Sequence, residues 1–307
     1  MIVGGGIAGL LTAYKLIEFK PLVFDRRWKA GKKCTGIISE STFERLGISK
    51  EFIDYKFKEI EIVYNNKYSV YIRANIIRLN REKLEEFLDR EVNTIRPRNV
   101  NIINNYIIMD GKEKYEGLVI NASGWKGKCK WIRAIEYTQE PINEDRIIVH
   151  INSKNMGGFG WIVPLPDRTL VGALSYQNPN LFIPRLDKRI FEIHGGAIPR
   201  VKPKIFNDLR IGDSTGLIKT FTGGGIFSIS LLLDPLIYGI KNNSWEEYNK
   251  AKLMIIKEIT KQYLITSFLE RLWKSIGFIF KLYKDKTIYV DKQFDFHSHL
   301  FSFLTKL

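Results

Sequence analysis

The chain opens with MIVGGGIAGLLTAYKLIEFKPLVFD, residues 1–25. Gly4, Gly6 and Gly9 follow a short apolar segment in the spacing Gly-x-Gly-x-x-Gly, and a second apolar segment ends at Asp25. This order predicts a strand, a tight turn, a helix and a second strand, with backbone amides at the helix N-terminus facing a pyrophosphate. Asp25 lies where a carboxylate accepts hydrogen bonds from a ribose diol. The opening segment therefore predicts a dinucleotide-binding βαβ unit.

Three later segments indicate which dinucleotide is bound. Residues 211–216 read IGDSTG, and residues 222–226 read TGGGI at the start of an apolar segment. In large flavoproteins a late Gly-Asp pair places its carboxylate, here Asp213, on the ribityl chain, and the following helix N-terminus faces the ring that becomes negative on reduction. Residues 119–124, VINASG, match the strand and small-residue turn that cross such a domain. Together these segments predict FAD rather than NAD.

The rest of the chain predicts an α/β architecture with a second, antiparallel sheet. Residues 57–73 alternate in the manner of strands around Asn65-Asn66 and predict a hairpin, and residues 131–175 are strand-like again. The other expected elements are helices over residues 81–92 and 225–238, strands within 100–121 and a strand within 203–216.

These elements divide the chain into three parts. The first is a discontinuous, three-layer Rossmann-like FAD-binding domain with a parallel sheet, the second an inserted antiparallel β-sheet substrate domain, and the third a short helical C-terminal region. In that order they take residues 1–55, 75–128 and 203–240; residues 56–74 and 129–202; and residues 241–307.

Composition limits the classes of partner and location. Of 307 residues, 45% are hydrophobic, which supports a buried core, and 48 Lys+Arg against 33 Asp+Glu give a net charge of +15. The charge predicts an anionic partner, and because no nucleic-acid readout motif is present we expect a phosphorylated or phospholipid partner rather than nucleic acid. No apolar stretch approaches the roughly 20 residues of a membrane span. We expect a cytoplasmic protein, with peripheral attachment to the inner face of the cell membrane left open.

Several of these segments resemble geranylgeranyl reductases, a branch of the hydroxylase-like FAD proteins. That family carries an aromatic-x-Trp-x-Phe-Pro signature followed by Gly-x-Gly, and here residues 159–164 read FGWIVP and residues 172–174 read GAL. Residues 80–88, NREKLEEFL, are similar to the family's Arg-bearing helix start, and residues 33–37, KCTGI, to its Cys-Gly-rich loop beside the flavin. The resemblance runs from residue 1 to about residue 240.

The chain departs from the family pattern at four positions. Phe159 replaces Tyr, Val163 replaces Phe, Leu174 replaces the second Gly of Gly-x-Gly, and Thr220 or its neighbour Phe221 stands where Pro is expected. These departures leave three hypotheses open: a prenyl reductase, a flavin-dependent monooxygenase or halogenase of the same broad fold, and a non-catalytic relative that binds FAD or an isoprenoid.

The resemblance implies an FAD-dependent oxidoreductase that saturates isolated double bonds of polyprenyl chains in archaeal membrane lipids by hydride transfer from reduced flavin. An isoprenoid or prenyl lipid is then the substrate, and the electron donor is open between a ferredoxin and NAD(P)H. Phe159, Trp161 and Cys34 are the candidate catalytic residues. Trp161 offers a cation–π wall, with a packing role as the alternative. Cys34 offers a proton donor or gate, with an inert buried thiol as the alternative.

The motifs also predict the residues that bind the cofactor. These are Gly4, Gly6, Ile7, Ala8, Gly9, Asp25, Arg26, Cys34, Thr35, Arg81, Ala122, Ser123, Gly124, Gly212, Asp213, Gly223, Gly224, Gly225 and Ile226.

Three other features are weighed separately. A basic cluster at residues 26–33 fits either a phosphate headgroup or a solvated surface. The partly amphipathic residues 268–281 fit either a membrane interface or a helical cap. His297-Ser298-His299 with Asp295 does not complete a ligand set, so we predict no metal.

Overall fold

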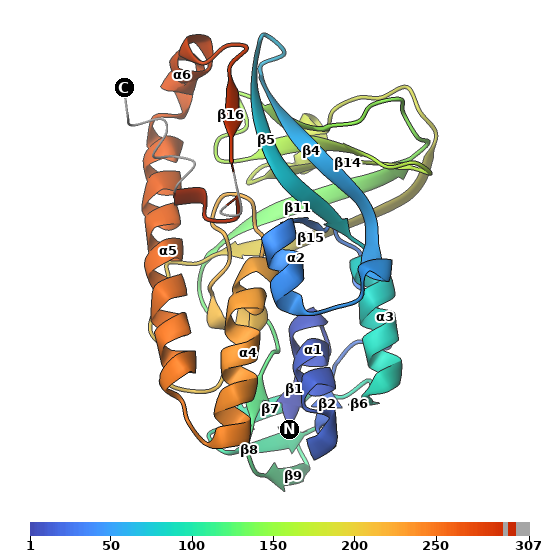
Figure 1. The fold of residues 1–307 in the computed structure, drawn as a ribbon, viewed down its shortest axis with the longest axis vertical. Helices are drawn as coiled ribbons and strands as arrows, with labels where there is room; N and C mark the ends of the chain where they lie inside the picture. Colours follow the sequence, from blue (N-terminus) through green and yellow to red (C-terminus); the bar gives the residue numbers. More distant parts are fainter. Residues whose placement is uncertain (291–293, 299–307) are drawn as a thin grey trace.

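The computed structural model describes residues 1–290 and 294–298. The first part of the fold is a parallel sheet in the order β10-β1-β2-β6, and Figure 1 labels three of its strands, β1, β2 and β6. Its strands are Ile120–Asn121, Ile2–Val3, Leu22–Phe24 and Asn93–Ile95. The helix predicted after the first glycines is α1, Ile7–Lys15, and a short 3-10 turn follows it.

The parallel sheet is covered on both faces because its side chains alternate in direction. Ile2 and Val23 join the core formed with α1, α3 (Arg81–Glu91) and α4 (Ile226–Asn242). Val3 and Phe24 pack in a separate cluster against the antiparallel sheet β7-β8-β9. The strands of that sheet are Val100–Ile103, Tyr106–Met109 and Glu113–Glu116. Helices, parallel sheet and antiparallel sheet therefore form three layers, which confirms the predicted Rossmann-like α/β arrangement.

A second, mostly antiparallel sheet has the order β15-β11-β14-β13-β12-β4-β5-β16, and β3 also pairs with β5. Its strands are β3 (Ile37–Ser39), β4 (Ile53–Tyr64), β5 (Tyr68–Leu79), β11 (Lys130–Gln139), β12 (Ile147–Ile151), β13 (Phe159–Pro164), β14 (Thr169–Ser175), β15 (Ile190–Arg200) and β16 (Thr287–Tyr289). The β4–β5 hairpin is confirmed. Asn65 and Asn66 turn it with φ of 48° and 54°, a conformation that Asn tolerates better than most residues.

The predicted helices form with clear local causes. Helix α3 begins at Arg81 because the side chain of Asn80 accepts a hydrogen bond from the Lys83 amide at 3.0 Å. Helix α4 runs past its predicted end to Asn242 and stops at Asn243, which is left-handed. The remaining helices are α2 (Glu40–Leu46), α5 (Glu246–Arg271) and α6 (Ile276–Leu282). No helix in the described ranges is long and apolar enough to span a membrane.

Two expectations about local structure are wrong. Residues 203–211 form no named strand, and only Arg210 makes an isolated parallel bridge, to Asn121. The C-terminal region is not helical throughout, because β16 pairs in parallel with β5. The proposed domain boundary between residues 74 and 75 falls inside β5, so this strand links the hairpin to the cofactor-side loop at residues 33–36.

A short C-terminal segment returns to the core. The Asp295 carboxylate, 1% exposed, accepts hydrogen bonds from Ser39 Oγ at 2.5 Å and Thr42 Oγ1 at 2.6 Å at the start of α2. Lys219 Nζ lies 2.5 Å from the same carboxylate. Burial alone would raise the pKa of Asp295, but the Lys219 charge and these hydrogen bonds hold it well below its usual range. His299 lies outside the described residues.

His297 makes the docking of this segment sensitive to pH. The side chain is buried, and burial, together with the nearby Lys219 charge, lowers its pKa from 6.5 to about 3 against the opposing effect of Asp295. The unfolded chain then binds more protons than the folded chain across this window, so stability falls as pH falls from about 6.5 toward 3.

We therefore expect wild-type protein to lose about 3 kcal/mol more than His297→Gln between about pH 7 and about pH 4. Urea titrations at each pH measure the free energy of unfolding. Equal losses in the two proteins would contradict a neutral, buried His297.

Candidate functional site

The glycines of the first turn have different structural roles. Gly4, at φ 113°, lies against the Ala122 carbonyl, and a Cβ on Gly9 would collide with the Gly4 carbonyl oxygen. Gly6 has φ −87°, which any residue adopts, and the nearest atoms to a Cβ there would be guanidinium nitrogens of Arg27 at 3.8 Å and Arg81 at 3.9 Å. Packing within the chain thus requires glycine at positions 4 and 9, whereas the space at Gly6 is open and bordered by two cations.

The later glycine-rich segments meet this turn. A Cβ on Gly212 would lie 2.6 Å from the Ala8 Cβ, so Gly212, at φ 72°, rests directly on α1. The Ile211 amide donates to the Asn121 carbonyl at 3.0 Å, and the Ser214 hydroxyl donates to the same oxygen at 2.6 Å. The Asp213 carboxylate lies against Gly225 just before α4 begins. Segments from the start, middle and later part of the chain therefore form one site at the N-termini of α1 and α4.

Asp25 is engaged within the chain. Its carboxylate accepts from the Gly5 amide at 2.5 Å and the Arg27 amide at 2.7 Å, and Arg96 Nη1 lies 3.2 Å away. Burial alone would raise the pKa of Asp25, but hydrogen bonds and charge from Arg27 and the charge of Arg96 lower it. Arg26 is exposed beside it. A ribose role for Asp25 and Arg26 stays a prediction.

Glu85 is a site residue that the sequence analysis missed. Its carboxylate is 0% exposed, accepts from the Ile7 amide at 3.0 Å and from the Lys32 amide at 2.9 Å, and pairs with Arg81 at 2.7 Å. Burial would raise the pKa of Glu85, but Arg81 and the Lys32 amide lower it, so the carboxylate stays ionised. Glu85 thereby fixes Arg81 at the N-terminus of α1. The sequence signal for Glu85 was its position four residues after Arg81 in the same predicted helix, where the two side chains can pair.

The second sheet turns a row of side chains toward this site. Trp161, Gly172, Glu136 and His194 are direct neighbours across β13, β14, β11 and β15. The indole of Trp161 lies over Gly172, where a Cβ would collide with it, and donates from Nε1 to Glu136 Oε2 at 2.7 Å. Gly172, the first glycine of the Gly-x-Gly signature, is therefore needed to leave room for the indole of Trp161. Glu136 and His194 were not predicted, because no sequence motif marks them.

Aromatic rings connect this row to the triple glycine. Phe159 lies 5.8 Å from Trp161 and stacks on Phe221 at 5.4 Å between ring centroids. Gly223, at φ 75°, rests on Ile198 of β15. The turn before α4 therefore faces the same side of the second sheet as Trp161.

The loop at residues 33–36 lies between β5 and the row of side chains that contains Glu136. Gly36, at φ 69°, packs on the Leu79 carbonyl, and the Thr35 hydroxyl donates to Glu136. The Cys34 carbonyl accepts from Arg78 at 3.4 Å, and the thiol is partly buried. Cys34, Thr35, Trp161 and Phe159 are thus near one another, whereas any catalytic role for them stays a prediction.

The basic cluster at residues 26–33 and the segment at residues 268–281 both make contacts within the chain. In the basic cluster, Arg27 pairs with Asp25 and Glu85, and Lys33 pairs with Glu192. In residues 268–281, Trp273 is buried and Phe280 stacks on Tyr64 at 5.0 Å, so this segment caps the β4–β5 hairpin. Phe268 and Phe278 remain 61% and 65% exposed.

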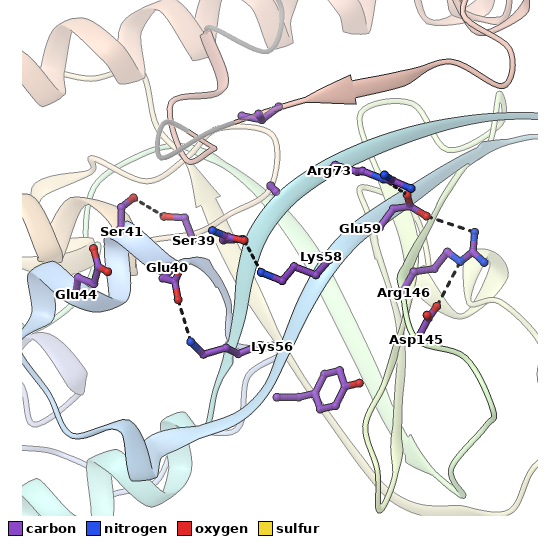
Figure 2. A pocket seen from close by; sticks show the side chains of 14 residues that line it. Ser39, Glu40, Ser41, Glu44, Lys56, Lys58, Glu59, Arg73, Asp145 and Arg146 are labelled. Atoms are coloured by element: carbon purple, nitrogen blue, oxygen red, sulfur yellow. Dashed lines mark hydrogen bonds and ion pairs between the residues drawn. The ribbon is translucent and has the colours of Figure 1, made fainter.

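A cavity of about 760 Å³ lies elsewhere, between the start of α2 and the outer face of the hairpin (Figure 2). Its cations have partners: Lys56 binds Glu40 at 2.9 Å, and Arg73 and Arg146 share Glu59 at 3.0 and 3.5 Å. Because charged side chains dominate this lining and neutralise one another, the cavity fits neither an apolar chain nor a free phosphate.

The residues at the glycine-rich turns fit a bound dinucleotide. The opening at Gly6 has free space, two guanidinium groups and the N-terminus of α1, which together suit a pyrophosphate. The Asp213 carboxylate and the N-terminus of α4 lie on the continuation of the same surface. This donor set matches a long dinucleotide better than a mononucleotide.

Comparison with known proteins agrees with this geometry. The family model described as an NAD(P)-binding Rossmann-like domain matches residues 2–46. No curated protein matches the chain. The fold is similar to a geranylgeranyl bacteriochlorophyll reductase-like protein from Thermoplasma acidophilum, with TM-score 0.74, 16% identity and coverage of 94% of this chain and 91% of that one.

Two further solved structures share the fold. PqsL, a probable FAD-dependent monooxygenase from Pseudomonas aeruginosa, has TM-score 0.65, 13% identity and coverage of 90% and 98%. The flavin-dependent brominase Bmp2 has TM-score 0.65, 13% identity and coverage of 99% and 92%. The chain therefore has the fold of FAD-dependent oxidoreductases, with a Rossmann-like dinucleotide-binding domain at its start.

Gly6 and Gly9 offer a matched pair of substitutions. Gly6→Ala enters open space, so we expect unfolding free energy within about 0.5 kcal/mol of wild type but at least tenfold weaker binding of FAD, about 1.4 kcal/mol. Gly9→Ala meets the Gly4 carbonyl and should cost about 3 kcal/mol of stability. Urea titration and flavin fluorescence measure the two effects. Unchanged FAD affinity in Gly6→Ala would contradict binding of the FAD pyrophosphate at this turn.

Proposed function

We propose that this protein is an FAD-dependent reductase that saturates isolated double bonds of polyprenyl chains. The observation that carries the proposal is an aromatic contact between the second sheet and the turn before α4: Phe159, beside Trp161 on β13, stacks on Phe221, which lies two residues before the triple glycine. An apolar, π-rich wall at that position suits a hydrocarbon substrate better than a polar one.

FAD is the proposed cofactor because NAD alone does not need the late Gly-Asp segment. Residues 4–9 and Arg81 would hold its pyrophosphate, Asp213 its ribityl hydroxyls, and the N-terminus of α4 its ring. Residues 122–124 would line the same groove. When bound, this group supplies a hydride equivalent to the substrate.

The chain's own residues would then serve the reaction. An isolated alkene is not electron-poor, so a proton must be delivered together with the hydride. Protonation builds partial positive charge on the carbon that accepts the hydride, and the indole face of Trp161 would stabilise that charge. Phe159 and Phe221 would exclude water from the same space. The partly exposed basic cluster would face the polar headgroup of the isoprenoid, and we place the protein on the cytoplasmic side of the membrane.

The alternative is a monooxygenase or halogenase. The overall likeness to PqsL and Bmp2 favours it, because both share this architecture over most of the chain. A relative that binds FAD or an isoprenoid without turnover is the third reading, motivated by Phe159, Val163 and Leu174 in the family signature.

The test uses the full chain loaded with FAD and photoreduced without oxygen. A reductase is reoxidised by geranylgeranyl diphosphate, and mass spectrometry finds two hydrogen atoms added per double bond. Reoxidation by air alone, with oxygen inserted into an added substrate, would support the monooxygenase instead. Flavin that stays reduced beside bound lipid would indicate a binder.

Substitutions at Trp161 test the proposed wall. Trp161→Phe keeps an aromatic face, whereas Trp161→Leu keeps only apolar bulk. We expect reoxidation by the polyprenyl substrate to be about tenfold slower in Trp161→Leu than in Trp161→Phe, as loss of a cation–π interaction of 0.5–2 kcal/mol implies. Stopped-flow absorbance of the flavin measures both. Equal rates would assign Trp161 to packing.

A further inference from the structure

Glu136 is a buried carboxylate on the same face of the second sheet as Trp161. It is 3% exposed, and its Oε2 accepts hydrogen bonds from Trp161 Nε1 at 2.7 Å and from the Thr35 hydroxyl. Burying a carboxylate costs several kcal/mol unless its oxygens are satisfied. Two donors fix one oxygen of Glu136, and the second oxygen is directed to a different group.

That group is His194. Its Nε2 lies 3.1 Å from Glu136 Oε1, in direct register across β11 and β15. This contact is within ion-pair distance but not in hydrogen-bond geometry, so within the described residues Glu136 Oε1 and His194 Nδ1 are buried atoms without a hydrogen bond. The imidazole side chain is still 21% exposed at its edge. The pair therefore combines a fixed carboxylate, a titratable ring with an unused nitrogen, and a route to solvent.

The pair lies between the segments that border the proposed cofactor. Thr35 belongs to the loop at residues 33–36, and Ile198, on the same face of β15 as His194, contacts Gly223. Between them Gly196 has open space where a side chain would project, and Ala134 beside it is small and half-buried. A ligand lying over Gly196 and Ala134 would contact the exposed edge of the His194 ring.

Other charges around the pair are compensated. Arg78, from β5, binds Asp54, and Lys33 binds Glu192 on the rim. Arg78 also donates to the Cys34 carbonyl of the loop, next to Thr35. Glu136 and His194 thus form a close pair whose carboxylate is almost completely buried, whereas the Lys33–Glu192 pair lies at the exposed rim.

We propose that His194 is the proton donor of the reduction and that Glu136 positions it, an inference that rests on the proposed function. Hydride from the reduced flavin adds to one carbon of the double bond, and the flavin is oxidised. The π electrons form the new bond between the other carbon and the proton of the His194 imidazolium. The ring is left neutral and recovers its proton from solvent at its exposed edge, while an external reductant, a ferredoxin or NAD(P)H, restores the cofactor.

Full-length, FAD-loaded His194→Gln and Glu136→Gln test this assignment. His150→Gln is the matched control, because His150 pairs with Gly160 and so lies on the opposite face of the same sheet from Trp161. After anaerobic photoreduction each protein is mixed with geranylgeranyl diphosphate. We expect reoxidation at least about 100-fold slower in both variants, with wild-type flavin spectra and photoreduction, and wild-type rates in His150→Gln.

A second readout needs no turnover. With ring-labelled histidine, adding FAD should shift the His194 resonances of the wild type and leave those of His150 in place, and Glu136→Gln should also shift His194. His194 resonances that ignore FAD would overturn the assignment, as would wild-type reoxidation rates in His194→Gln. Loss of FAD binding in the variants would make the pair structural and overturn it too. If the wild type is not reoxidised by the polyprenyl substrate at all, the proposed function fails, which is a separate and recognisable result.

Discussion

Contact between backbones at the first glycine turn is the constraint on which the rest of the structure depends. Gly4 touches Ala122, Gly9 touches Gly4, and Gly212 rests on Ala8, each at a distance that leaves no room for a side chain. These contacts bring three segments, far apart in the chain, to the N-termini of two helices. Because the N-termini of both helices carry partial positive charge and then lie at one site, the same packing that closes the core also gives a surface suited to an anion.

Buried carboxylates hold the surrounding groups in place. Glu85 fixes Arg81 and the N-terminus of α1, Asp25 holds Arg27 and Arg96, and Glu136 holds Trp161. Each is nearly inaccessible to water, and each accepts hydrogen bonds from more than one donor, Glu136 through its Oε2 alone. The cationic and aromatic walls of the site are therefore fixed before any ligand arrives, which favours binding by reducing the entropy lost on association.

Local patterns predicted the elements but not the contacts between distant ones. The glycine spacing, the alternation around Asn65-Asn66 and the helical spacing of residues 81–92 are local signals, and the corresponding elements form. The Glu136–His194 pair depends on the register of β11 with β15, which no motif encodes. Likewise, β16 joins the second sheet because β5 offers it an edge, and the strand expected within residues 203–216 is reduced to one bridge between Arg210 and Asn121.

Hydrogen–deuterium exchange with and without FAD tests the central claim most directly, because it reports every segment at once. The account predicts that saturating FAD slows exchange together in peptides covering residues 4–9, 121–124 and 211–226, with no comparable change in the β7–β9 sheet. Protection confined to residues 4–9, or no protection anywhere, would contradict a single dinucleotide site built from these three segments.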